Sequence, residues 1–275
     1  MRETLLDGAK SLLGECCYIL NQNNIEYLIV GGWAPFLYNS NGYLHPGTKD
    51  VDILFKRGFE ENQLKEIIEI FLSKGFFQSA KHSFQLLKEI EINGYNFIYN
   101  VDLLHPDNQE KKPEMYVDHI NFPIKESIYI SVNYKGKTIL LPKSDSFFTD
   151  FSDKYTDSFH LLNDETAEIT FDLLDEAGII LSKLESAFIA KRDRDAYDIY
   201  LALKYNRDYE STILKLKKII AENLSVKNLF EKFLKKESIV YLDDKVTDWT
   251  AKMNNYNPNF SSIEVFEKLK IDLVL

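Results

Sequence analysis

The stretch from Asp50 to Phe55 constrains the fold more than any other part of this sequence. It reads Asp-Val-Asp-Ile-Leu-Phe, and its β-branched and large apolar residues predict a buried strand. Side chains two residues apart on a strand point to the same face, so the Asp50 and Asp52 carboxylates are expected side by side. Apolar neighbours raise the cost of burying two like charges, and a divalent cation between them removes that conflict. Two solvated carboxylates at a strand edge are the alternative.

The first half of the chain alternates short strands and helices before it turns to strands alone. Apolar spacing and turn residues predict the following elements: a helix over 3–22, a strand over 26–30, a short helix over 33–38, a strand over 50–55 and a helix over 60–74. A hairpin follows around Asn93-Gly94, with strands over 84–92 and 95–104. A second hairpin is predicted around Lys135-Gly136, with strands over 128–134 and 138–141.

The second half is predicted to be helical. Strand patterns are not evident after about residue 143, and residues 143–165 are interpreted as a linker or a short helical insertion. The predicted helices span 166–190, 193–205, 208–223, 226–236 and 261–270. The prediction is an α+β protein with a catalytic domain over 1–145, built on a mixed sheet with flanking helices, and a helical domain over 146–275.

Amino-acid composition limits the compartment, the ligands and the metal sites that are expected for the protein. The only two cysteines, Cys16 and Cys17, are adjacent, which disfavours a disulfide between them, so we expect buried thiols in a reducing cytoplasm. No apolar run reaches the roughly 18 residues of a membrane span. The net charge of −10 argues against broad, non-specific binding to nucleic acid but allows a local basic groove. The five histidines are scattered without metal-ligand spacing, so no zinc site is predicted.

Two further features lie near the aspartate pair. Asp102 is a carboxylate within the apolar run Val101–Leu104, and a third carboxylate beside Asp50 and Asp52 makes a two-metal site plausible. An outward-facing strand residue is the alternative for Asp102. Gly31 and Gly32 follow one predicted strand and precede a short helix, where backbone comes close to a ligand and N–H groups favour phosphate. A simple tight turn is the alternative there.

This order of elements resembles the nucleotidyltransferase superfamily that includes DNA polymerase beta. The match covers about residues 26–104: strand, Gly-Gly, short helix, loop, Asp-x-Asp, and a carboxylate on a later strand. The resemblance implies two Mg²⁺ ions bound by Asp50, Asp52 and Asp102, with Asp102 acting as or beside the general base. It also implies that Gly31 and Gly32 hold the triphosphate of a nucleoside triphosphate such as ATP. Thr48 and Lys49 lie next to Asp50 and have two interpretations: they reach the phosphates, or they only shape the loop.

A second block, from Leu181 to Tyr200, narrows the resemblance. On one continuous helix Lys183, Ala187, Lys191, Arg194 and Asp198 fall on one face. A solvated, salt-bridged surface is the ordinary interpretation of such a face. The block also resembles the Lys-x-x-Ala…Arg-Asp-x-x-Asp segment of the AbiEii/AbiGii toxin family. That resemblance implies that the block, with Arg194, completes the nucleotide site and that Lys183 contacts the triphosphate or stabilises charge developing on it. It also implies that Asp195 and Asp198 orient the basic groups or act near the attacking hydroxyl.

The resemblance implies an enzyme that transfers a nucleoside monophosphate to an acceptor hydroxyl. AbiEii-like toxins form the enzyme half of type IV toxin–antitoxin pairs and some modify the acceptor end of tRNA, so RNA is the expected acceptor and an antitoxin a possible partner. Two alternatives stay open. The first is that Gly31-Gly-Trp-Ala34 also resembles the opening motif of antibiotic nucleotidyltransferases, which modify lincosamides or aminoglycosides. Many members of the superfamily instead carry Ser after the first glycine, where this chain has Gly32. The other alternative is a non-catalytic binding module that keeps the fold.

Overall fold

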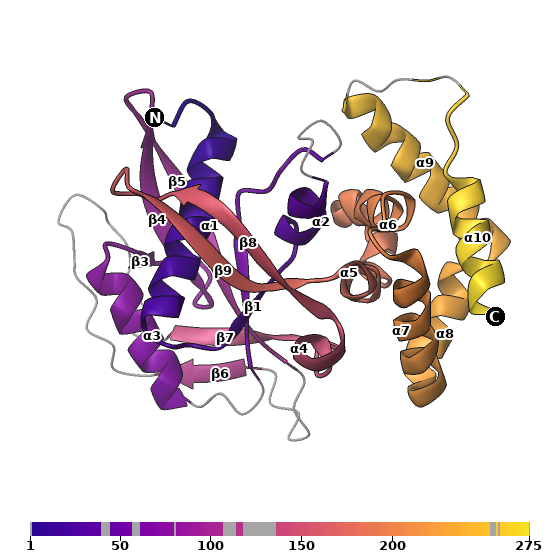
Figure 1. The fold of residues 1–275 in the computed structure, drawn as a ribbon, viewed down its shortest axis with the longest axis horizontal. Helices are drawn as coiled ribbons and strands as arrows, with labels where there is room; N and C mark the ends of the chain where they lie inside the picture. Colours follow the sequence, from indigo (N-terminus) through magenta and orange to yellow (C-terminus); the bar gives the residue numbers. More distant parts are fainter. Residues whose placement is uncertain are drawn as a thin grey trace. The chain divides into compact units, whose positions relative to one another are not determined.

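The chain folds into two compact units, and the ribbon is drawn in Figure 1. This computed structural model describes residues 2–39, 45–56, 61–79, 81–106, 114–117, 136–253, 257 and 259–274. Unit 1 comprises Met1–Trp33, Gly47–Phe148 and Ser152–Leu173. Unit 2 comprises Ala34–Pro46, Thr149–Phe151 and Leu174–Leu275.

Unit 1 is built around one mixed β-sheet. Its strands are β1 (Tyr27–Val30), β2 (Val51–Phe55), β3 (Phe77–Gln78), β4 (Gln85–Ile92), β5 (Tyr95–Pro106), β6 (Glu114–Val117), β7 (Gly136–Leu141), β8 (Ser152–His160) and β9 (Thr166–Leu174). The spatial order is β3-β4-β5-β2-β1-β9-β8, with β7 also pairing with β5 and β6 pairing with β7. β2 pairs parallel with β5 and antiparallel with β1, whereas β4 and β5 form an antiparallel hairpin. The central strands β1 and β2 are therefore hydrogen-bonded on both sides.

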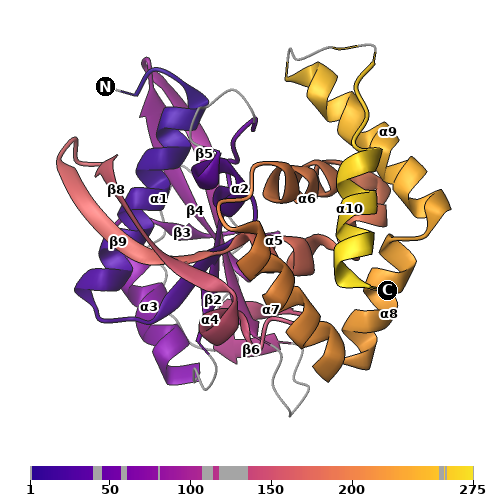
Figure 2. The same cartoon turned by 45° about the vertical axis from the view of Figure 1, so that its right-hand side comes forward.

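Helices α1 (Leu5–Gln22) and α3 (Glu61–Ser73) cover one face of this sheet, as Figures 1 and 2 show. A capping box at Thr4 and Asp7 begins α1. Tyr99 Oη on β5 donates a hydrogen bond to the Leu5 carbonyl oxygen in α1 at 2.8 Å. Odd-numbered residues of central β5 therefore point towards α1, and even-numbered ones point to the opposite face.

The hairpin of β8 and β9 corrects the prediction for the middle of the chain. Residues 152–160 and 166–174 are strands, so the predicted helix over 166–190 is wrong in its first part. Ile169, Phe171 and Leu173 are buried and alternate with polar residues, which is the period of a strand. The predicted domain boundary at 145/146 lies between β7 and α4 and stays a prediction; unit 1, as the contacts divide the chain, extends to Leu173.

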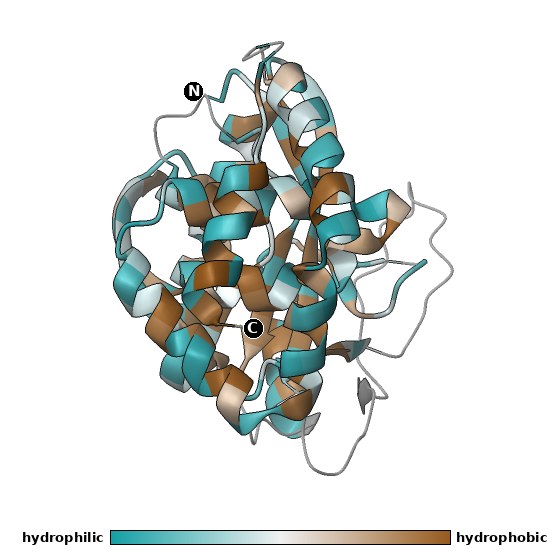
Figure 3. Ribbon diagram, turned by 90° about the vertical axis from the view of Figure 1, so that its right-hand side faces the viewer, coloured by the Kyte–Doolittle hydropathy of each residue, from teal (hydrophilic) through white to brown (hydrophobic). Residues whose placement is uncertain are grey.

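Unit 2 is mainly helical. Its helices are α5 (Glu176–Lys183), α6 (Arg194–Lys204), α7 (Tyr209–Glu222), α8 (Leu224–Phe233), α9 (Lys236–Lys252) and α10 (Ile263–Leu273), with most of α2 (Trp33–Tyr38) and the end of α4 (Phe147–Asp150). Figure 3 shows apolar and polar residues on different sides of these helices. The fully buried Phe230, Phe233 and Phe266 form part of its core. The sequence did not predict α9, although Ile239, Leu242 and Val246 have helical spacing and are buried.

The remaining fold predictions are mostly confirmed. The α+β class is confirmed, as are the Asn93-Gly94 hairpin and the helices close to 193–205, 208–223 and 226–236. The thiols of Cys16 and Cys17 are buried and form no disulfide. The strand predicted over 128–134 lies outside the described residues. Among the helices of the described residues, none combines the length and apolarity that crossing a membrane requires.

Candidate functional site

Strand pairing brings the Asp52 and Asp102 positions next to each other. β2 and β5 are parallel neighbours, and their register pairs Val51 with Val101 and Asp52 with Asp102. Neighbouring strands lie about 4.8 Å apart, so two carboxylates begin from adjacent backbone positions. Asp50 immediately precedes β2, two residues before Asp52. All three predicted carboxylates therefore belong to one region of the sheet in unit 1.

These carboxylates lie on the face that α1 does not cover. Tyr99 points towards α1, so Asn100 and Asp102 point the opposite way. Asp52 is half-buried, and its strand neighbours Val51 and Ile53 are fully buried. The alternation of β2 thus serves two purposes: one face of the strand completes the core, and the other presents carboxylates.

Two side-chain amides hold two of the carboxylates. Asn100 Nδ2 donates to Asp50 Oδ1 at 3.0 Å, and Gln85 Nε2 donates to Asp102 Oδ1 at 2.8 Å. An amide orients a carboxylate without neutralising its charge. Sequence reasoning missed Gln85 and Asn100 as site residues. A signal was present for Gln85, because the two-residue Asn93-Gly94 turn sets a register that pairs residue 85 with residue 102.

Gly31 lies directly against the Asp52 carboxylate. Its φ is +70°, a backbone conformation that residues with a Cβ seldom adopt. A Cβ on Gly31 would lie 1.9 Å from Asp52 Oδ2 and 2.8 Å from Asp52 Cγ. Both the conformation and the lack of space therefore require glycine at this position. Gly32 is buried and Thr48 is half-buried, and their predicted contacts with a triphosphate stay predictions.

The donor set suits a hard divalent cation. Mg²⁺ takes oxygen ligands, usually one or two carboxylates together with substrate phosphates, and Asp50, Asp52 and Asp102 supply carboxylate oxygens on one face. The space over Gly31 that a Cβ would fill is used by the Asp52 carboxylate. Within the described ranges, no three His, Cys, Asp or Glu side chains are gathered closely enough to form a metal site as they stand. The carboxylates are instead individually positioned groups on a shared face.

Unit 2 contains a separate, buried network of charges. Lys183, at the end of α5, places Nζ 2.7 Å from Asp195 Oδ1 and 2.9 Å from Asp198 Oδ2. Arg194 Nε lies 3.7 Å from the same Asp198 oxygen. The side chains of Lys183 and Asp195 are less than a tenth exposed, and that of Asp198 is fully buried. Two cations thus face two carboxylates inside the helical unit.

The ion pairs shift the pKa values of Asp198 and Lys183 in the direction that keeps both side chains charged. Burial raises the pKa of Asp198, but the charges of Lys183 and Arg194 and the hydrogen bond from His45 outweigh it, so this pKa lies well below its usual range. Burial lowers the pKa of Lys183, but Asp198 and Asp195 outweigh it, and this pKa is raised. Each side of the ion pair therefore stabilises the charged form of the other.

The block does not form the one continuous helix on which the shared face would depend. α5 ends at Lys183, two short 3-10 turns span Ser186–Phe188 and Ala190–Arg192, and α6 begins at Arg194. Lys183 meets Asp195 and Asp198 because α5 and α6 pack together, not because the residues share one helix face. Lys191 is exposed and outside the network. The predicted contacts of Lys183, Arg194, Asp195 and Asp198 with a nucleotide stay predictions.

His45 also belongs to this network, which sequence reasoning did not anticipate. Its Nε2 atom lies 3.1 Å from Asp198 Oδ1, and both side chains are fully buried. The ring packs edge-on against Phe36 at 5.8 Å between centroids. Burial lowers the pKa of His45, and although Asp198 opposes this shift, the lower pKa prevails. Neutral His45 therefore donates its Nε2 proton to the ionised Asp198.

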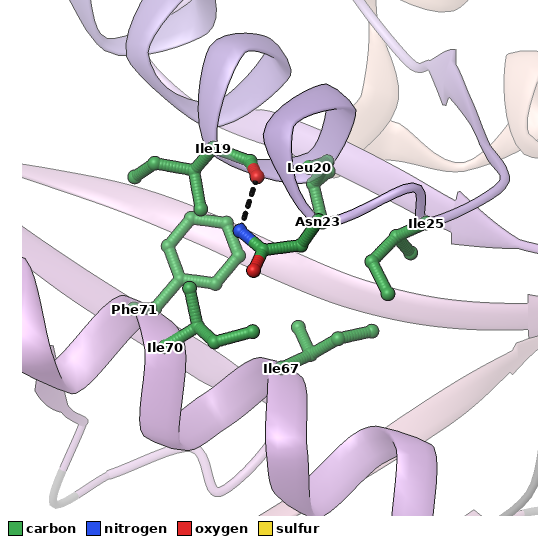
Figure 4. Close-up of a pocket in the computed structure, with 7 residues that line it drawn as sticks. All are labelled: Ile19, Leu20, Asn23, Ile25, Ile67, Ile70 and Phe71. Atoms are coloured by element: carbon green, nitrogen blue, oxygen red, sulfur yellow. Dashed lines mark hydrogen bonds between the residues drawn. The ribbon is translucent and has the colours of Figure 1, made fainter.

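An apolar hollow in unit 1 is unrelated to these charged groups. It lies between α1 and α3 and is lined by Ile19, Leu20, Asn23, Ile25, Ile67, Ile70 and Phe71, as Figure 4 shows. Its one polar side chain, Asn23, donates through Nδ2 to the Ile19 carbonyl oxygen at 2.8 Å. The hollow thus offers no polar group of the kind that orients a ligand, and we interpret it as a packing defect.

Comparisons with known proteins give little further information. No model of a known protein family matches this chain, and no curated protein matches it. Among solved structures, it is similar to an antigenic nucleotidyltransferase-like protein from Paracoccidioides brasiliensis. That match has 12% sequence identity, covers 80% of this chain and 91% of the other, and has a TM-score of 0.35. So low a likeness carries no argument about function, which therefore has to come from the site.

Proposed function

We propose that the chain is a Mg²⁺-dependent nucleotidyltransferase that moves a nucleoside monophosphate from a nucleoside triphosphate to an acceptor hydroxyl. The observation that carries this proposal is the register of β2 and β5, which pairs Asp52 with Asp102 on the face opposite α1. Asp50 lies two residues from Asp52 on the same chain segment. Adjacent carboxylates of this kind repel one another, and an oxygen-seeking cation offsets that repulsion.

The surrounding residues support the same interpretation. Asn100 and Gln85 fix the orientation of Asp50 and Asp102 while leaving their negative charge in place. Gly31 brings the backbone after β1 against the Asp52 carboxylate, where any larger residue would displace it. Aspartates that are only hydrated surface groups require no hydrogen bond from a side-chain amide. They also require no neighbouring glycine whose Cβ position is already occupied by the carboxylate. We interpret these contacts as pre-organisation of the carboxylates.

The proposed roles follow from this arrangement. Asp50, Asp52 and Asp102 would hold Mg²⁺, and Asp102 would take the proton of the attacking hydroxyl. Bound Mg²⁺ would stabilise the negative charge that develops as pyrophosphate leaves. Gly31, Gly32 and Thr48 would contact the triphosphate. A contact of Lys183 with the triphosphate is part of the proposal only if its ion pairs with Asp195 and Asp198 are exchanged for phosphate.

The acceptor is proposed from a sequence resemblance and from the net charge of the chain. The resemblance of the Lys183–Asp198 block to the AbiEii/AbiGii toxins favours RNA, tRNA in particular, and with it a toxin role and an antitoxin partner. The net charge of −10 favours a cationic small molecule instead, as in aminoglycoside-modifying nucleotidyltransferases. The two acceptors share the same carboxylates and differ only in what brings the hydroxyl to them.

Labelled nucleotides test the proposal directly. The protein is incubated with each α-labelled nucleoside triphosphate and Mg²⁺, with either total RNA or a mixture of aminoglycosides and lincosamides as acceptor. Asp50→Ala/Asp52→Ala is the inactive variant, and Asp244→Ala/Asp248→Ala, which removes two exposed carboxylates from α9, is the matched control. Label in RNA with the intact protein and the α9 variant alone supports an RNA-directed enzyme, and label in the antibiotics supports the second acceptor. Label that never leaves the triphosphate pool contradicts the proposed function.

A further inference from the structure

His45 stands at the start of the segment that carries the proposed site residues into β2. The segment runs from His45 through Thr48 to Asp50, where β2 follows at once. Only its first side chain is fully buried with an ionic partner, the Asp198 carboxylate at 3.1 Å. A fully buried imidazole next to a fully buried carboxylate costs free energy unless the two are hydrogen-bonded, so the contact defines where His45 lies.

The Asp198 side of this contact is itself rigidly held. Asp198 lies in α6, and its second carboxylate oxygen faces Lys183 and Arg194. Lys183 is in turn held by Asp195. With neutral His45, the two cations balance the two carboxylates, and the network contains no uncompensated charge. His45 is therefore hydrogen-bonded to a carboxylate whose other oxygen is already ion-paired within unit 2.

The later part of the segment is held within unit 1. Gly47 has φ of +81°, and a Cβ there would lie 2.7 Å from Leu6 Cδ1 in α1. Asp50 accepts its hydrogen bond from Asn100 on β5. Thr48 and exposed Lys49 thus lie between anchored residues on both sides. Loss of the hydrogen bond between His45 and Asp198 would release the first residue of the segment, while the contacts of Gly47 and Asp50 would remain.

We infer that His45, through its hydrogen bond to Asp198, is a positioning residue that fixes the segment carrying Thr48 and Asp50. The inference rests on the proposed function for its catalytic consequence, because it supposes that Asp50 binds Mg²⁺. His45 precedes Thr48 by three residues and Asp50 by five residues along the chain. Its effect is exerted through the backbone that follows it.

Two amide substitutions separate positioning from simple packing. In His45→Gln the side-chain amide takes a place close to that of Nε2 and can still donate to Asp198 Oδ1. In His45→Asn the same chemical group is one methylene shorter and does not reach it. His45→Leu removes the donor altogether. His160→Leu, which changes an exposed histidine on β8, is the matched control.

Amide hydrogen exchange of the full-length variants is the first readout, because it requires no enzymatic activity. We expect exchange at residues 47–50 to be faster by about tenfold in His45→Asn and His45→Leu, and unchanged in His45→Gln and His160→Leu. Equal exchange at these amides in all variants would overturn the inference. So would equal acceleration in His45→Gln and His45→Asn throughout α5 and α6, which is what a packing role predicts.

Steady-state nucleotide transfer is the second readout. We expect kcat to fall by about tenfold or more in His45→Asn with a smaller change in KM, and His45→Gln to restore kcat to within about threefold. Unchanged kcat in His45→Asn together with faster exchange would show that the segment does not govern catalysis, which overturns the inference. If the wild-type protein transfers no label, the proposed function fails, and hydrogen exchange still decides whether His45 holds the segment.

Discussion

The aspartates of unit 1 and unit 2 differ in their hydrogen-bond and ion-pair partners. In unit 1, Asp50 and Asp102 accept hydrogen bonds from neutral amides, and the carboxylates are half-buried. In unit 2, Asp195 and Asp198 are buried and face the cations Lys183 and Arg194. A hydrogen bond from an amide leaves the negative charge of a carboxylate in place, whereas the ion pairs of unit 2 offset it. The same residue type is thus hydrogen-bonded to amides in one unit and ion-paired to buried or partly buried cations in the other.

The largest expected effect concerns the unit 1 carboxylates. Asp52→Asn keeps the shape of the side chain and removes its charge. We expect nucleotide transfer to fall by about 10³-fold or more, while the free energy of unfolding stays within about 0.5 kcal/mol of wild type. Steady-state kinetics and urea denaturation measure the two quantities. A variant that loses stability and activity together would place Asp52 with the structural aspartates of unit 2.

The unit 2 network is expected to show the opposite behaviour. Lys183→Met leaves two carboxylates without their shared cation in a site where the lysine side chain is only 9% exposed. We expect the free energy of unfolding to fall by about 3–5 kcal/mol. Lys56→Met, which removes an exposed pair with Glu26, should cost less than about 1 kcal/mol. If denaturation midpoints show similar losses for both variants, Lys183 is not the counter-ion that the structure indicates.

Gly31 offers a test of the close approach to Asp52. Gly31→Ala combines a left-handed backbone with a Cβ placed on the Asp52 carboxylate. Gly94→Ala has the left-handed backbone alone, because nothing lies within 4 Å of its Cβ position. We expect Gly94→Ala to cost about 1–2 kcal/mol and Gly31→Ala about 1 kcal/mol more, with a loss of transfer activity only in the latter. Equal losses of stability and full activity in both would contradict a role for the contact.

The smallest effect is a dependence of stability on pH. The pKa of folded His45 is lowered by burial, which outweighs the opposing effect of Asp198, while Arg194 and Lys183 lower it further. The unfolded chain, with an ordinary histidine pKa near about 6.5, then binds the proton first as pH falls. The contribution of His45 to the free energy of unfolding is therefore complete above about pH 6.5 and decreases below that pH. Thermal unfolding of wild type should show a steeper loss between pH 7 and 5 than His45→Gln, and an identical slope would contradict the burial of a neutral His45.

Local sequence patterns predicted much of unit 1. The apolar run after Asp50 and the Asn93-Gly94 turn predicted β2 and the β4–β5 hairpin because both depend on residues close in the chain. They also placed Asp50, Asp52 and Asp102 on strands or beside them. The failure came at β9, where Glu168, Ala167 and Leu174 favour helix while Ile169, Phe171 and Leu173 alternate as in a strand. Pairing with β1 decided in favour of the strand.

The sequence did not predict contacts between residues that lie far apart along the chain. That Asp52 faces Asp102, 50 positions later, depends on β2 and β5 being parallel neighbours. The phosphate contact predicted for Gly31 stays a prediction, and the sequence did not indicate that Asp52 occupies the space of its missing Cβ. Lys183 and Asp198 do meet, although the continuous helix on which they were expected to share a face does not exist.

By itself, the sequence determined the α+β class, the strand that carries two carboxylates and the residue types from which a cation site can be built. These features follow from side-chain periodicity and turn chemistry, which act over a few residues. Only the tertiary structure decided which carboxylates receive amides and which receive a buried lysine, and only it brought His45 to Asp198, 153 positions away in the chain. The reason is physical: the ionisation and partners of a carboxylate depend on burial and on charges supplied by other elements, and no local pattern encodes either.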